Sequence, residues 1–370
     1  MIYIFIFAFS GVLLYLSEYL KKIGNKHLAE CTAIMMLLFV SIFAGIRSVD
    51  VGTDVSYYVV KHFEWAKMYD KKFVDFVKYM YSYEEVDFLY AVIQYLGANF
   101  FGNLHIVLFI LSFITNTFVY LAIKEENKKI SVPIAWIFYC LLFFNTSLNI
   151  VRQSCAIAIV FYIAILYSSK KISLKKFLLF GIFAALFHRT AILAIVVIGS
   201  FIFMGSKKKY NYILVFMTLI ICMFPFFLTA LGSVLSNVNF LPQRYNTYFE
   251  TLNAEQSSVL LDAIVYAVPT ALIAIYMRYK KRDMNHRYYL SIGLVCICAY
   301  LWTNLLMERI SYYFIVFFSN SIPYAINVIS AKRNARFIVT VVMLFWIGII
   351  WFINIIVYRY GQTYPYSIGI

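Results

Sequence analysis

Charged residues are scarce in this sequence, and their scarcity limits the kind of protein it can encode. Only 13% of the 370 residues are Asp, Glu, Lys or Arg, and 63% are hydrophobic, against about 25% and 45–50% in a typical soluble protein. A globule of this size could not hide so much apolar surface from water, whereas a lipid bilayer could. The composition therefore predicts an all-α polytopic membrane protein, with one integral membrane domain over residues 1–370. A soluble enzyme and a secreted factor are excluded.

Acidic residues are rarer than basic ones, 17 against 32, which gives a net charge of +15. This excess does not indicate nucleic-acid binding, because most of the Lys and Arg residues lie in short clusters between apolar segments. Such clusters set the orientation of a chain in a membrane, since loops rich in Lys and Arg stay in the cytoplasm. Lys21, Lys22 and Lys26 follow the first apolar segment. We therefore expect the N-terminus, and by alternation the C-terminus, to lie outside.

Several catalytic and metal-binding patterns are missing. The chain has no phosphate-binding glycine loop, no Gly-x-Ser-x-Gly motif and no His-Glu-x-x-His motif, each of which marks a particular chemistry. Its six cysteines all fall in apolar stretches without zinc-like or redox spacing, which favours core packing. We expect neither a metal nor a cofactor.

The apolar segments predict 11 or 12 transmembrane helices. A helix needs about 20 apolar residues to cross a bilayer. Twelve segments approach this length: 2–20, 31–46, 104–123, 133–144, 150–167, 177–187, 191–204, 212–231, 259–277, 288–307, 310–329 and 337–356.

Two segments need a separate interpretation. The pair 177–187 and 191–204 is short, so it forms either two tilted spans or a hairpin that stops part-way. Segment 88–100 is also short for a span, and we interpret it as a buried or interfacial helix. It belongs to a long outer loop at 47–103, and a second outer loop covers 232–258.

Isolated arginines occur on the predicted outer side, where orientation needs no positive charge. The planar guanidinium group binds phosphate through two hydrogen bonds at once, so arginines that converge on an outer cavity would suit a diphosphate. Alternatively, each one reaches the lipid headgroups or pairs with a local acid. These arginines are Arg47, Arg152, Arg189, Arg244 and Arg309.

Polar residues accompany each arginine. In the first outer loop Asp50 and Asp54 flank Gly52, although Thr53 and Asp54 could instead cap the next helix. At helical spacing, Asn149 would share a face with Arg152 and Gln153. The remaining neighbours are His188 beside Arg189, Tyr245 and Tyr248 after Arg244, and Glu308 and Tyr312 around Arg309.

These clusters, in this order, resemble the EpsG family of bacterial membrane proteins and the wider Wzy-type polysaccharide polymerases. The matching pieces are G-I-R (45–47), V-G-T-D-x-x-x-Y (51–58), N-x-x-R-Q (149–153), F-H-x-T-A (187–191), R-Y (244–245), E-R-I-x-Y-Y (308–313) and P-Y (365–366). Each motif is short, and the shared order carries the resemblance over most of the chain. Arg189 departs from the family pattern, which has a small polar residue there, and this suggests a different sugar or acceptor contact.

The resemblance implies a GT-C-like fold and a metal-independent glycosyltransferase of the bacterial inner (cytoplasmic) membrane, with its active site facing outside. Wzy-like proteins join oligosaccharide repeat units carried on undecaprenyl diphosphate, in the synthesis of O-antigen (in lipopolysaccharide), capsule or exopolysaccharide. A flippase and a chain-length regulator are the expected protein partners, and no nucleic acid is involved.

The resemblance and the residue types together assign candidate roles. The arginines would bind the diphosphate, whose charge grows as it leaves, with Arg47 also holding the first loop. The candidates for the general base are Asp54, His188 and Glu308, and Asp54 is slightly favoured because GT-C enzymes carry an acid in the first outer loop. The candidate sugar-binding residues are Asn149, Gln153, Tyr57, Tyr245, Tyr248 and Tyr312.

Three other functions compete with a polymerase. The first is a GT-C-like transferase that adds one sugar from a polyprenyl-phosphate donor. The second is a flippase for lipid-linked glycans, which would favour ionisable residues at the middle of several spans; here Glu18 and Asp262 lie toward span ends. The third is an acyltransferase with a membrane-embedded histidine, for which only His188 is available.

Overall fold

The computed structural model describes residues 2–70, 72–205, 305–329 and 333–369, and every regular element among them is helical. Six described segments are long and apolar enough to cross a membrane, which confirms a polytopic helical membrane protein. They are Ile2–Lys22 (α1), Lys26–Gly45 (α2), Leu104–Glu125 (α6), Val132–Asn149 (α7 to α8), Val151–Ser168 (α9) and Arg333–Val357 (α18 and the turn after it). Predicted spans 212–231 and 259–277 lie outside the described residues, as does 288–307 except for its last three residues, which begin α16 (Leu305–Ile315), so the total of 11 or 12 stays a prediction.

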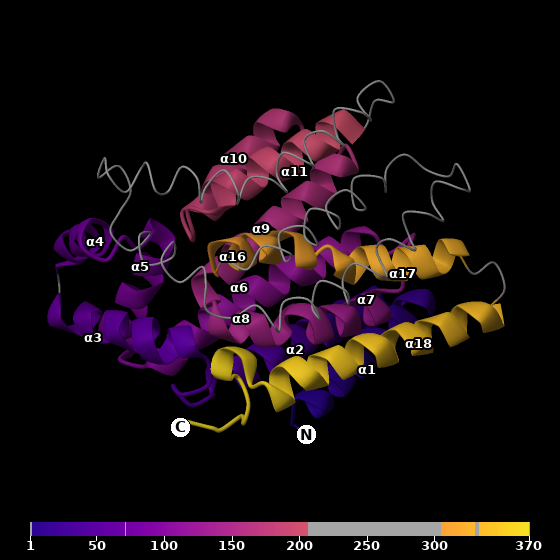
Figure 1. Ribbon diagram of the computed structural model, residues 1–370, viewed down its shortest axis with the longest axis horizontal. Helices are drawn as coiled ribbons and strands as arrows, with labels where there is room; N and C mark the ends of the chain where they lie inside the picture. Colours follow the sequence, from indigo (N-terminus) through magenta and orange to yellow (C-terminus); the bar gives the residue numbers. More distant parts are fainter. Residues whose placement is uncertain (1, 71, 206–304, 330–332, 370) are drawn as a thin grey trace.

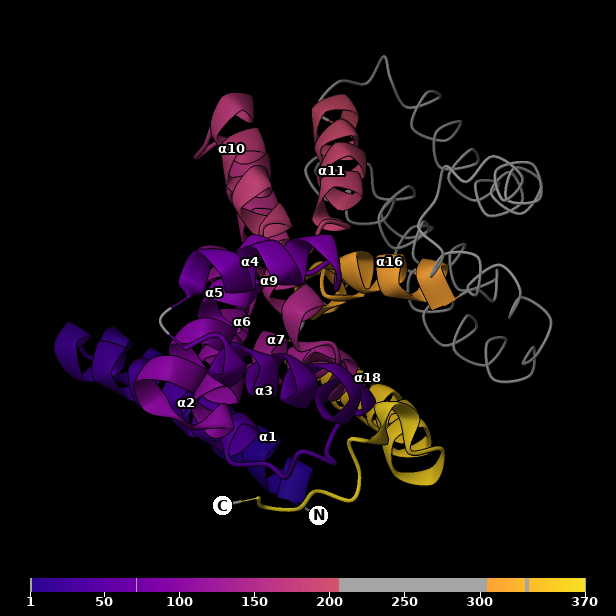
Figure 2. The ribbon, with the colours of Figure 1, turned by 90° about the vertical axis from the view of Figure 1, so that its left-hand side faces the viewer.

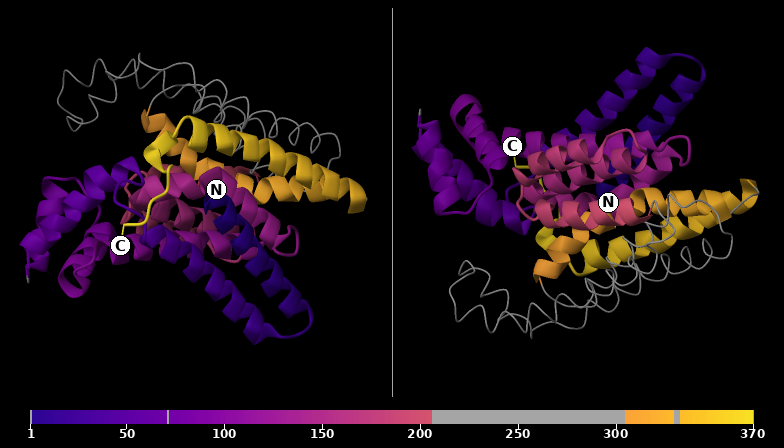
Figure 3. Two further views of the ribbon diagram at one scale, coloured as in Figure 1. Left: turned by 90° about the horizontal axis from the view of Figure 1, so that it is seen from below. Right: turned by 90° about the horizontal axis from the view of Figure 1, so that it is seen from above.

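The bundle is built around α6 and α9, which pack along each other (Figure 1). In α9, 72% of the residues in the apolar window are buried, against 28% in α18, so α9 is a central helix and α18 presents most of its apolar surface outward. The α1–α2 hairpin packs through α2 on α6 and leans away from the other helices (Figure 3). Helix α17 (Phe318–Ile329) packs on α7 (Val132–Tyr139).

The short pair predicted at 177–187 and 191–204 forms two neighbouring helices, α10 (Leu174–Ala185) and α11 (Ala191–Gly205). They lie side by side and both contact α9 (Figure 2). Helix α10 has 12 residues, a length of about 18 Å, which is less than the roughly 30 Å of a bilayer core. Of the two alternatives, α10 therefore fits the hairpin that stops part-way.

Three short helices fold from the segment 47–103 and gather at one end of the bundle (Figure 1). They are α3 (Val60–Met68), α4 (Phe73–Ser82) and α5 (Phe88–Leu96). The predicted helix at 88–100 is α5 continued by the π-helical turn Gly97–Phe101, and its buried residues include Tyr90, Ile93 and Gln94. Several of its other side chains, such as Phe88 and Phe100, are exposed, so the helix is half-buried and fits both predicted alternatives, a buried or an interfacial helix.

The C-terminal tail returns to the start of the chain at this same end (Figure 2). The backbone NH of Ser48 donates to the carbonyl of Ser367 (2.8 Å), and the NH of Gly369 donates to the carbonyl of Ile46 (3.0 Å). The Tyr3 hydroxyl donates to the carbonyl of Thr363. We call this end, formed by residues 46–103, 148–153, 186–190 and 358–369, the loop end.

One buried asparagine joins three membrane helices. Asn116 of α6 donates from Nδ2 to Ser41 Oγ of α2 (3.3 Å) and accepts at Oδ1 from the Tyr139 hydroxyl of α7 (2.8 Å). All three side chains are buried. Because lipid chains are as apolar as the helix surfaces, such polar contacts help to decide which helices pair.

We predict that Asn116→Leu destabilises the protein by roughly 1 kcal/mol, because it removes both contacts at nearly constant volume and leaves Ser41 and Tyr139 unpaired. Unfolding of the purified protein in increasing denaturing detergent would measure this change. Tyr139→Phe, which removes one of the two hydrogen bonds, should lose about half as much. An unchanged midpoint for Asn116→Leu would contradict a structural role for the network.

Candidate functional site

Arg47 holds the loop that follows α2 in place and does not line a cavity. Its side chain is fully buried, and its guanidinium donates to the carbonyls of Ala44, Val51 (3.3 Å) and Leu148 (2.8 Å). Burial disfavours its charge and lowers its pKa to about 10. Backbone carbonyls occupy both terminal nitrogens as well as Nε, so the structure supports the loop-holding role and not the predicted diphosphate contact.

Gly52 and Asn149 fix the position of the loop that follows. Gly52 has φ +104°, and a Cβ atom there would lie 3.0 Å from the carbonyl oxygen of Leu148, so a glycine is required. Asn149 Oδ1 accepts from Thr53 Oγ1 (3.0 Å) and from the backbone NH of Asp54 (2.8 Å). The Asp54 side chain makes no capping hydrogen bond to the helical turn after it, so the alternative role of Asp54 as a helix cap is wrong.

The predicted helical face shared by Asn149, Arg152 and Gln153 is also wrong. Asn149 ends α8 (Asn145–Asn149), and Ile150 leaves the helix with φ −85° and ψ +54° before α9 begins. The break turns Asn149 toward the first loop. It leaves Arg152 and Gln153 in the first turn of α9, where both line a cavity.

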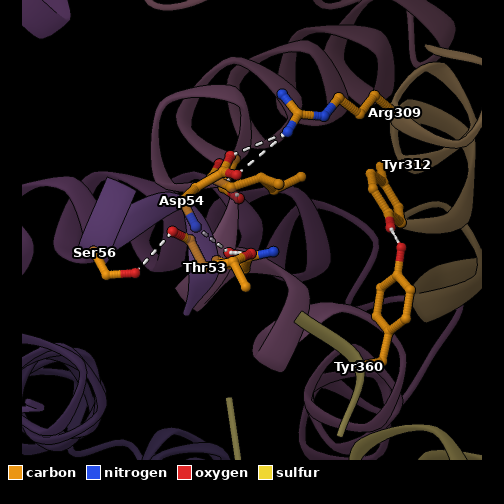
Figure 4. A network of polar contacts seen from close by, with 9 residues as sticks. Thr53, Asp54, Ser56, Arg309, Tyr312 and Tyr360 are labelled. Carbon is orange, nitrogen blue, oxygen red and sulfur yellow. Dashed lines mark hydrogen bonds and ion pairs between the residues drawn. The ribbon is translucent and has the colours of Figure 1, made fainter. Parts of the chain in front are cut away.

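Asp54 and Arg309 form an ion pair across the site, 255 residues apart in sequence (Figure 4). Arg309 Nη2 lies 3.3 Å from Asp54 Oδ1 and 3.4 Å from Oδ2. Both side chains are about one-fifth exposed, so water still reaches the pair. The helix that carries Arg309, α16 (Leu305–Ile315), is tied to α9 because Gln153 Nε2 donates to the carbonyl of Arg309 (2.6 Å).

A small, partly open polar hollow lies at this ion pair. It collects five of the predicted site residues from four separate parts of the sequence. Its lining residues are Asp54, Tyr58, Val59, Ile150, Val151, Arg152, Gln153, His188 and Arg309.

Arg152 is the cation in this cavity with unused hydrogen-bond donors. Its guanidinium carbon lies 5.2 Å from the centroid of the Tyr90 ring, and among the described residues it makes no hydrogen bond or ion pair. Nearby, the Oε1 atom of Gln153 is buried without a hydrogen-bond partner in the described part of the chain. Unused polar groups in a cavity are costly unless a ligand satisfies them.

His188 is oriented by a short hydrogen-bond chain. Its Nδ1 lies 2.7 Å from Thr190 Oγ1 and accepts from the Thr190 backbone NH (3.4 Å), and Thr190 Oγ1 lies 3.1 Å from the Tyr313 hydroxyl. With Nδ1 accepting, the neutral ring carries its proton on Nε2. His188 is thus set up as a hydrogen-bond donor at the cavity.

Arg189 is paired with local acids and does not line the cavity. Its Nη1 lies 3.7 Å from Glu85 Oε2, and its Nε lies 3.5 Å from Asp87 Oδ1. Its side chain also donates to the backbone carbonyl of Glu85. Burial raises the pKa of Asp87, against the opposing effect of Arg189 and Arg152. Arg189 therefore joins the α10–α11 tip to the start of α5, the local pairing considered as its alternative role.

The two described tyrosines that were predicted to bind sugar, Tyr57 and Tyr312, do not line the cavity. Tyr57 is 72% exposed and does not line the cavity, whereas its neighbour Tyr58 does; both lie in the π-helical turn Val55–Val59. Tyr312 is buried, and its hydroxyl meets that of Tyr360 in the tail at 3.0 Å (Figure 4).

Four predicted site residues cannot be placed in this way. The backbone of Glu308 belongs to α16, but its side chain lies outside the described residues. Arg244, Tyr245 and Tyr248 also lie outside them. Among the described residues, no group of three or more His, Cys, Asp or Glu side chains is placed to hold a metal ion.

Sequence reasoning missed Tyr58, Tyr90 and Asp87. Tyr58 is the last residue of the V-G-T-D-x-x-x-Y motif (51–58), but the neighbouring Tyr57 was predicted to bind the sugar. Tyr90 belongs to the apolar segment 88–100, where an aromatic residue suggests packing. Asp87 precedes that segment, and no spacing rule connects it with Arg189, which is 102 residues away.

The geometry defines a class of protein: a polytopic helical membrane protein whose helices bring arginines, a carboxylate and a histidine to one polar cavity. The chain belongs to the EpsG family, whose model matches residues 31–368. Membership of this family indicates a membrane glycosyltransferase-like polymerase of polysaccharide synthesis. No curated protein and no solved structure matches the chain.

We predict that Arg47→Gln lowers the stability of the protein by about 3 kcal/mol or more. The shorter side chain cannot reach the three carbonyls, which are then buried without donors. The midpoint temperature of thermal unfolding in detergent and the protein level in membranes should both fall. Arg152→Gln is the matched control and should leave both unchanged; equal stability of the two variants would contradict the difference in role.

Proposed function

We propose that this protein is a polymerase that joins undecaprenyl-diphosphate-linked repeat units at the outer face of the bacterial inner membrane. Undecaprenyl-diphosphate-linked glycans would be both donor and acceptor, and a flippase and a chain-length regulator would be its partners. The observation that carries the proposal is the Arg152 guanidinium, which lines the cavity with its donors unused, beside Arg309.

The reaction breaks the bond between the anomeric carbon of the donor glycan and a diphosphate oxygen. The acceptor hydroxyl forms the new bond to that carbon and loses its proton to a base, while the electron pair of the broken bond stays on the diphosphate. Because the diphosphate gains charge, fixed cations stabilise the transition state. Arg152 and Arg309 line the cavity and would stabilise this charge. His188 Nε2 would add a neutral hydrogen-bond donor.

Asp54 is the favoured base among the three candidates. Its carboxylate lines the cavity and is held in place by Arg309 and, through its backbone NH, by Asn149. His188 is less suited, since its Nδ1 accepts from Thr190 and its Nε2 carries the proton. Tyr58 offers a ring face and a hydroxyl at the cavity, a combination that suits a sugar.

The lining of this site carries groups of both signs, which favours a transferase over a flippase. The carboxylate of Asp54 and the guanidinium of Arg152 line the same hollow, so one could take up a proton while the other meets the leaving group. Among the described helices, ionisable residues of this kind gather at the loop end, whereas transport favours them near the middle of several spans.

We predict that Arg152→Gln and Arg309→Gln each abolish polymerisation while the protein level in membranes stays normal, because the cations act on the leaving diphosphate. A strain that lacks the gene, complemented with each variant, would show its surface polysaccharide on a gel as a single repeat unit instead of a ladder. A product one sugar heavier, or the loss of even the single unit, would indicate the transferase or the flippase instead.

Arg333→Gln provides the control, because Arg333 is exposed at the start of α18, away from the cavity. It should retain the full ladder. A full ladder in both Arg152→Gln and Arg309→Gln would contradict the proposed diphosphate contact.

A further inference from the structure

Arg152 is held by an aromatic ring in place of a carboxylate. The centroid of the Tyr90 ring of α5 lies 5.2 Å from the guanidinium carbon of Arg152, within the range of a cation–π contact. Of the three carboxylates just before α5, those of Glu85 and Asp87 are paired with Arg189, and that of Glu84 lies near Lys61 and His62. Arg152 therefore keeps its charge and its hydrogen-bond donors, of which a guanidinium has five.

Hydrogen bonds at its hydroxyl hold the Tyr90 ring in place. Its side chain is fully buried, and its hydroxyl lies 3.1 Å from His62 Nδ1 and accepts from Gln94 Nε2 (2.6 Å). Gln94 Nε2 also donates to the carbonyl of Val59 (3.4 Å). Because Val59 lines the cavity, the network connects the ring under Arg152 with the cavity wall.

The histidine in this network stays neutral. His62 is buried in α3, and burial, with the charges of Arg152 and Lys61, lowers its pKa to about 3. A neutral imidazole can accept a hydrogen bond from the Tyr90 hydroxyl at Nδ1. A positive charge at this place would repel Arg152, so a neutral partner suits a ring that must attract the guanidinium.

We infer that Tyr90 is a positioning residue for Arg152, whose guanidinium it holds at the cavity by its ring face, while no other described residue occupies the N–H donors that would bind the lipid diphosphate. A carboxylate in the same place would offset part of the charge and occupy N–H donors, as Asp54 does at Nη2 of Arg309. The ring restrains the cation without either cost. The inference rests on the proposed function, since it assumes that Arg152 binds the diphosphate.

The test measures the Kd of undecaprenyl diphosphate for the purified protein in lipid nanodiscs. We expect Tyr90→Leu to weaken binding roughly tenfold, equivalent to about 1.4 kcal/mol, and Arg152→Gln to weaken it at least as much. The double variant should bind no more weakly than Arg152→Gln alone, because the ring acts only through the guanidinium. Tyr90→Phe keeps the ring and should stay within about threefold of the wild type.

A ring-electron series separates this role from simple packing. Replacement of Tyr90 by phenylalanines with one, two and three ring fluorines keeps the shape but withdraws electrons from the face. We expect the Kd to rise step by step with fluorination, as a cation–π contact requires. A flat series would overturn the inference even if Tyr90→Leu failed to fold.

The other outcomes are also decisive. If Arg152→Gln weakens binding and Tyr90→Leu does not, the positioning role is wrong and the proposed function stands. Additive losses in the double variant would likewise overturn it, because Tyr90 would then act independently. If Arg152→Gln binds as the wild type does, the diphosphate contact itself is wrong, and the inference falls with it.

Discussion

The contact between Asn149 and the loop that follows α2 decides which side chains reach the cavity. The chain leaves the helix at Ile150, and the Asn149 side chain accepts hydrogen bonds from Thr53 and Asp54. This contact sets the Asp54 carboxylate opposite Arg309, while the restart of the helix after Ile150 brings Arg152 into the same hollow. A continuous helix through this point would separate the acid from the cations.

Three arginines of the loop end differ in what surrounds them, and these surroundings decide their roles. Backbone carbonyls surround Arg47, two acids pair with Arg189, and an aromatic ring supports Arg152. Carbonyls and carboxylates occupy N–H donors, whereas a ring does not. Only in the last case does the described structure leave a cation with all its donors available to an anionic substrate. The positive charge that the three arginines share does not predict these different roles.

The sequence predicted the helices and the converging motifs well, because both depend on composition and order. Long apolar runs became helices α1, α2, α6 and α9, and motifs far apart in sequence contributed Asp54, Arg152, His188 and Arg309 to one cavity. The local geometry could not be predicted. No sequence pattern indicated the helix break at Ile150 or the π-helical turn Val55–Val59, and the side chains of Asn149 and Tyr57 lie elsewhere than predicted. Tyr90 was hidden in an apolar segment that indicated only packing.

The central claim is that the protein itself joins lipid-linked repeat units. A strain that lacks the gene should accumulate the single lipid-linked unit, which can be extracted and supplied to the purified protein in liposomes without other enzymes. The account predicts products that grow by whole repeat units, with one undecaprenyl diphosphate released for each bond formed. An intact substrate, or products that grow by single sugars, would contradict it.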